Sequence, residues 1–68
     1  MQMQIYEAIL ARPETVRQAR EQQHAIERLG GTLEISPPSD TGMTLVRLSL
    51  PEPFTPADVL PGLPFFPA

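Results

Sequence analysis

The sequence predicts an α+β fold, a small β-α-β-β domain with a three-stranded, largely antiparallel sheet, one helix on one face and a proline-rich apolar C-terminal tail. Three segments alternate apolar and polar residues, the two-residue period of half-buried strands: residues 2–11, 32–36 and 43–50. Residues 13–29 are instead rich in Glu, Gln, Ala and Arg, which favour a helix. Gly30 and Gly31 then separate the helix from the second strand.

The first strand is the element with a competing interpretation. Residues 1–5 alternate cleanly, but residues 6–11 are apolar on both sides and contain Glu, Ala and Leu, so a helix is the alternative there. Pro13 disfavours the helical conformation at Arg12, so such a helix would end within a few residues. We therefore expect a strand over residues 2–11.

The helix is expected to begin at Pro13, whose missing N–H is no loss at the first helical position. Its apolar residues form a narrow stripe at helical spacing, with Gln22 and Gln23 in the gap: Val16, Ala19, Ile26 and Leu29. A narrow stripe predicts a helix that covers one face of a sheet. Gly30 is expected to end it in the left-handed conformation.

Residues 43–50 form the strand with the clearest alternation. One face carries Val46, Leu48 and Leu50. The opposite face carries Arg47 and Ser49, but also Met43 and Leu45. This leaves apolar surface on the side away from the helix, which indicates a partner.

The tail, residues 54–68, is expected to pack either on the body of the domain (residues 1–53) or on a partner subunit. Thr55, Pro56 and Asp58 predict a short helix with a capping box, which Pro61 ends. Residues 59–68 carry no side-chain charge, whereas disordered tails are usually polar.

The chain has 68 residues and no cysteine. A domain of this size buries only about 60% of its unfolded surface and often needs a second subunit, a metal or disulfides. Disulfides are excluded. The open sheet face and edges therefore predict a homodimer or a higher symmetric oligomer.

The leading functional hypothesis is a non-enzymatic, self-associating interaction or assembly module that uses the open sheet face and the tail. Its expected partner-binding residues are Phe54, Val59, Leu60, Leu63, Phe65, Phe66, Met43 and Leu45. The tail has two interpretations: it completes the chain's own core, or it is an apolar ligand for another protein.

Catalytic chemistry has little support. There is one histidine, no cysteine and no lysine, and no serine has an apparent base. We predict no catalytic residue, no cofactor and no metal. The alternative hypothesis is a small-ligand or metal-binding protein, enzymatic or not, with a site between subunits near Tyr6, Glu21 and His24. Glu21 and His24 are three residues apart, so they share a helix face.

The net charge of −3 argues against nucleic acid as a partner. The five arginines are interleaved with acids along the sequence, whereas nucleic-acid binding normally uses a basic stripe. No apolar run approaches the ~20 residues of a membrane span, and the N-terminus lacks a signal-peptide pattern. We expect no membrane association and a cytoplasmic location.

Three local resemblances concern the helix and the strands after it. Residues 24–51, especially 29–36 and 42–51, resemble the last helix and hairpin of histidine-kinase-type ATPase domains. Residues 1–23 contain no counterpart of that family's nucleotide-binding boxes. Residues 26–33 are similar to a helix–Gly-Gly–strand element of small phycobilisome linker proteins. The element order also resembles the tautomerase superfamily, although Met1-Gln2 stands where that family has its catalytic proline. The first resemblance implies helix–hairpin geometry and no ATP site.

Overall fold

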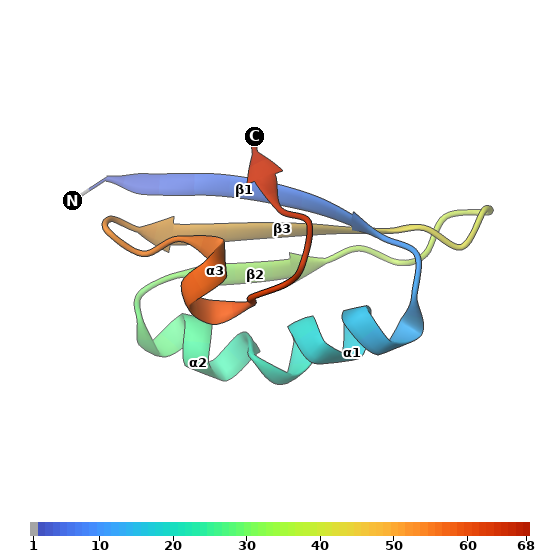
Figure 1. Cartoon of the computed structure of the whole chain (residues 1–68), viewed down its shortest axis with the longest axis horizontal. Helices are drawn as coiled ribbons and strands as arrows, with labels where there is room; N and C mark the ends of the chain where they lie inside the picture. Colours follow the sequence, from blue (N-terminus) through green and yellow to red (C-terminus); the bar gives the residue numbers. More distant parts are fainter. Residues whose placement is uncertain (1) are drawn as a thin grey trace.

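The computed structural model describes residues 2–68 and shows an α+β fold with one antiparallel sheet (Figure 1). In chain order its elements are β1 (Met3–Leu10), α1 (Pro13–Glu21), α2 (Gln23–Arg28), β2 (Thr32–Ile35), β3 (Thr44–Pro51), α3 (Pro56–Val59) and β4 (Phe66–Pro67). The predicted order of strand, helix, strand and strand is present, and residues 3–10 form a strand, not a helix.

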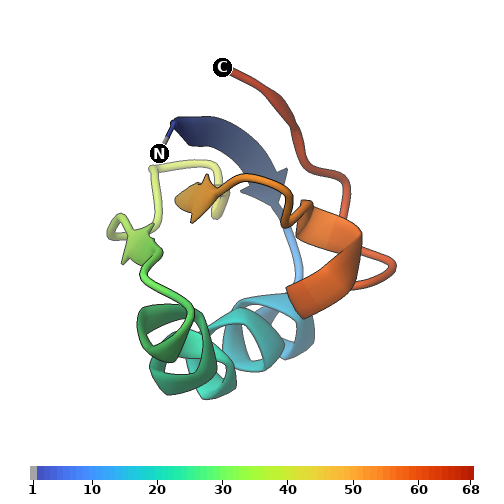
Figure 2. The ribbon, with the colours of Figure 1, turned by 90° about the vertical axis from the view of Figure 1, so that its left-hand side faces the viewer.

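The sheet has the strand order β2-β3-β1-β4, with β3 and β1 in the middle. Both β1 and β2 pair antiparallel with β3, so they run in the same direction on either side of it. The chain connects them through α1 and α2, which lie together on one side of the sheet (Figure 2). Strand alternation therefore divides the sheet into a covered face and an open face.

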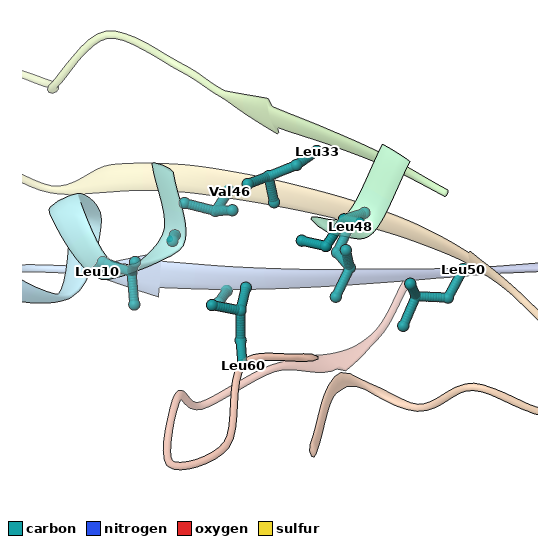
Figure 3. Close-up of a cluster of buried hydrophobic side chains, with 9 residues drawn as sticks. Leu10, Leu33, Val46, Leu48, Leu50 and Leu60 are labelled. Atoms are coloured by element: carbon teal, nitrogen blue, oxygen red, sulfur yellow. The ribbon is translucent and has the colours of Figure 1, made fainter. Parts of the chain in front are cut away.

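The hydrophobic core lies between the covered face and the helices. Ala8 of β1 pairs with Val46 of β3, and Leu33 of β2 pairs with Leu48, so these side chains share one side of the sheet. Ala19 and Ile26 come from the helices and are fully buried. The labelled side chains in Figure 3 converge from the strands and the tail on this region: Leu10, Leu33, Val46, Leu48, Leu50 and Leu60.

The prediction of one continuous helix is wrong, because the helix breaks at Gln22. The backbone there has φ −92° and ψ 0°, and the Gln22 N–H donates to the Ala19 oxygen, three residues back, at 3.1 Å. Such a tightened turn redirects a helix. The break falls in the gap of the apolar stripe, where no buried side chain requires straight continuation. Gln23 Nε2 instead donates to the Leu33 carbonyl of β2 at 3.4 Å.

The predicted number of strands is also wrong, because the end of the tail forms a fourth strand. Phe66 pairs with Glu7 and Pro67 with Tyr6, and the Ala68 N–H donates to the Ile5 oxygen at 2.9 Å. Two residues are too few to show alternation, and a proline argues against a central strand. On an edge strand Pro67 is tolerated because its missing N–H faces away from the ladder.

The rest of the tail folds back on the body of the same chain. The Thr55 N–H donates to Asp58 Oδ2 at 2.8 Å, so the predicted cap of α3 is present. Leu60 is 1% exposed and belongs to the core. The other apolar residues of the tail that pack against that core are Phe54, Val59, Leu63 and Phe65. In Figure 2, α3 (orange) closes the side of the core that α1 and α2 leave open.

The end of α2 is set by the two glycines. Gly30 has φ 91°, and the N–H groups of Gly30 and Gly31 donate to the Glu27 and Ile26 oxygens, each at 3.0 Å. These two bonds make a Schellman motif, which turns the chain toward β2. Gly31 is buried, and a Cβ atom there would overlap the Ser49 carbonyl oxygen of β3. The helix end can approach the sheet only because this residue lacks a side chain.

We expect Gly31→Ala to lower the free energy of unfolding by at least about 2 kcal/mol, because the added methyl group displaces backbone in a packed region. Gly42→Ala is the matched control. Gly42 also has a positive φ but has open space around it, so only the backbone strain remains, roughly 1 kcal/mol. Urea unfolding followed by circular dichroism measures both. Equal costs would contradict the close approach at Gly31.

We expect Leu60→Ala to cost about 2–5 kcal/mol of stability, the range for a fully buried leucine. Leu29→Ala is the control, because Leu29 is 36% exposed at the end of α2; its cost should stay below about 1 kcal/mol. The same unfolding experiment compares them. A Leu60 cost as small as that of Leu29 would show that the tail is not part of the core.

Candidate functional site

The open face of the sheet carries most of the exposed large apolar side chains of residues 2–68. Of the seven large apolar side chains that are exposed among the described residues, five lie on this face, with exposed fractions from 39% to 51%: Met3, Ile5, Ile9, Leu45 and Phe66. Contiguous apolar patches on a soluble surface usually mark interaction sites. The helices cover only the opposite face (Figure 2).

The register of the strands places one group of these side chains at each end of β1 and Phe66 beside its middle. Ile9 lies directly across from Leu45 toward the end of β1. Met3 and Ile5 lie at the beginning of β1, across from Pro51 and Ser49. Phe66 lies beside the middle of β1, across from Glu7. Directly opposed cross-strand neighbours are about 5 Å apart, so Ile9 and Leu45 form one apolar surface.

An ion pair occupies the centre of the face. Arg47 Nη2 and Nε donate to Glu7 Oε2 at 2.9 and 3.2 Å. The Glu7 side chain is only 21% exposed, although it lies on the uncovered face. Glu34 of β2 lies across from Arg47 on its other side and is exposed. An exposed ion pair adds little stability. This pair lies between the two apolar groups, and each of its charges is neutralised by the other.

The structure separates the predicted partner-binding residues into two sets. Phe66, Leu45 and Met43 are exposed; Met43 is 38% exposed and directly precedes β3. Leu60 is in the core, out of reach of any partner of the folded chain. The remaining four are half-buried against the core of the same chain: Phe54, Val59, Leu63 and Phe65. The exposed set therefore has the most side-chain surface accessible to a partner.

Met3, Ile5, Ile9 and Glu7 were not among the partner-binding residues predicted from the sequence. The only signal in the sequence was the parity of the strand, which identifies these residues once the covered side is known. Ala8 and Leu10 face the core, so the odd-numbered residues of β1 must face away from it. The alternation of residues 1–5 indicates a strand but leaves open which side of it is covered.

The alternative site near Tyr6, Glu21 and His24 is not assembled within one chain. Tyr6 lines a shallow hollow of about 270 Å³ beside α3, and neither Glu21 nor His24 is among the residues that line it. The His24 side chain is 94% exposed, and its Nδ1 lies 3.7 Å from Glu27 Oε1, not from Glu21. Across residues 2–68, no three His, Asp or Glu side chains are grouped so as to hold a metal ion. A site between subunits stays a prediction.

Comparison with known proteins gives no relative. No protein-family model matches the chain, and neither a curated protein nor a solved structure does. The three local resemblances in the sequence receive no support from these comparisons. None of the helices within residues 2–68 has the length and apolar character that a membrane span needs. Function has to be argued from the surface itself.

Proposed function

We propose that this chain is a non-enzymatic interaction module that self-associates through the open face of its sheet, as a homodimer or a higher symmetric oligomer. The observation that carries the proposal is the cluster of half-exposed apolar side chains around the Glu7–Arg47 ion pair. Phe66 is the contribution of the tail to this surface, since the other apolar tail residues are packed in the chain's own interior.

The size of the chain favours a second copy as the occupant. The covered face of the sheet, the helices and the tail all pack into one core. No further segment of residues 2–68 is left to cover the open face. A two-fold interface brings the same patch of both copies together, so an apolar patch is complementary to itself. Sheets packed face to face lie about 10 Å apart and bury just such alternating side chains.

The charges on the face are compatible with that arrangement. Charged residues at the centre of an interface are costly unless they are paired. Glu7 and Arg47 already pair within each chain at 2.9 Å. Glu34 and Arg47 have opposite charges on neighbouring strands, so a two-fold partner can offer an acid to each arginine and an arginine to each acid. Polar contacts of this kind determine orientation more than affinity.

We expect Ile5→Glu combined with Ile9→Glu to convert the oligomer to a monomer, because facing copies would bury like charges without partners. The dissociation constant of the oligomer should rise more than tenfold for each buried charge. Sedimentation equilibrium of the full chain measures it, and circular dichroism verifies that the variant is folded.

Leu29→Glu is the matched control, because Leu29 is the exposed apolar residue that lies on α2's end and not on the open face. This variant should associate like the unmodified chain. The proposal would be contradicted if the unmodified chain were a monomer at every accessible concentration. Equal weakening by the Leu29 variant and by the paired Ile5 and Ile9 changes would also contradict it.

A further inference from the structure

A cleft of about 630 Å³ lies on the other side of the molecule, between α1 and the turn that joins β2 to β3. The end of β1 and the beginning of α1 form one wall, and residues 35–38 form the other. Leu10 and Thr44, which pair across β1 and β3, line its inner end and are 3% and 6% exposed. Thr44 is the one polar side chain in the buried set of residues 2–68.

Three of the five arginines of the chain line this cleft: Arg12, Arg17 and Arg20. No acidic residue is among the lining residues. The ion pairs of residues 2–68 join His24 to Glu27 and Arg47 to Glu7, so none of the three guanidinium groups is held by a carboxylate. The rest of the chain has two arginines against eight acids, a formal charge of −6. Positive charge is therefore concentrated in the cleft of an acidic protein.

Secondary structure explains how the cleft is assembled. Pro13, Val16, Arg17 and Arg20 recur at the spacing that places side chains on one helix face. Arg12 directly precedes α1, so it brings a third guanidinium group to the same end of the helix, where Glu14 is the acidic residue of the first turn. The opposite wall is braced by its own turn, in which the Ser39 N–H donates to the Met43 oxygen at 2.8 Å.

We propose that this cleft binds a small molecule that combines an anionic head carrying two negative charges, a phosphate ester or a dicarboxylate, with an apolar body. Guanidinium groups match such oxygens in paired, charge-assisted hydrogen bonds. The apolar body lies against Leu10, Val16, Ile35 and the prolines of the turn. The volume is within the range of small-molecule sites, roughly 300–1,000 Å³.

Phenyl phosphate is the probe, titrated into the ¹⁵N-labelled full chain and followed by NMR. We expect saturable shifts at backbone amides that line the cleft, including those of Val16, Ile35 and Thr44. Phenol tests the apolar body alone, and it should bind at least tenfold more weakly. Phthalate distinguishes a carboxylate source from a phosphate source: whichever anion binds more tightly identifies the head group.

Arg17→Gln combined with Arg20→Gln should weaken binding at least tenfold, because charge-assisted hydrogen bonds are lost. Arg28→Gln on α2 removes the same charge away from the cleft and should leave the affinity within twofold. Arg12→Gln removes the third arginine of the cleft and should also weaken binding of the probe, which gives a second test of the same wall.

The proposal is overturned if neither anion gives saturable shifts, if phenol binds as tightly as phenyl phosphate, or if Arg28→Gln weakens binding as much as the cleft variants. Shifts confined to the open sheet face would overturn it as well. The chain with Ile5→Glu and Ile9→Glu should bind the probe like the unmodified chain. Failure of the cleft is thereby separated from failure of self-association.

Discussion

The antiparallel pairing of β1 with β3 is the contact on which the rest of the structure depends. It joins eight residues to eight and lies at the centre of the sheet, with β2 and β4 added at either edge. A shift of register by one residue would move every side chain to the opposite face. The pairing of Ala8 with Val46 and of Leu10 with Thr44 therefore determines at once what enters the core and what stays on the surface.

This constraint produces a protein that is covered on one side only. The two helix segments and the tail cover one face of the sheet, and Leu60 of the tail is part of the core between them. The tail thus serves as a clamp within the chain, because its cap, its buried leucine and its edge strand all contact the body. The opposite face keeps its apolar residues and is left to a second copy in the function that we propose.

The two sides of the molecule also differ in charge. The open face has its arginine paired with Glu7, at 2.9 Å, and an apolar surround that suits contact with protein. The cleft on the helix side has three arginines without carboxylate partners in residues 2–68, which suits an anion. Because the two regions share no lining residue, binding in the cleft and association through the sheet need not compete. A single 68-residue chain has room for both.

The sequence by itself determined the local elements. Alternation determined β2 and β3, Pro13 the beginning of α1, Gly30 the end of α2, and Thr55 with Asp58 the cap of α3. These features depend on neighbours in the chain. Three others were decided by tertiary structure alone: the fourth strand, the covered side of β1, and the cleft wall of residues 35–38 that faces the arginines of α1. Each depends on contacts between residues that are distant in sequence. The strand β4, for example, forms by pairing Phe66 with Glu7. The period of a strand says that its two faces differ; only packing decides which face is buried.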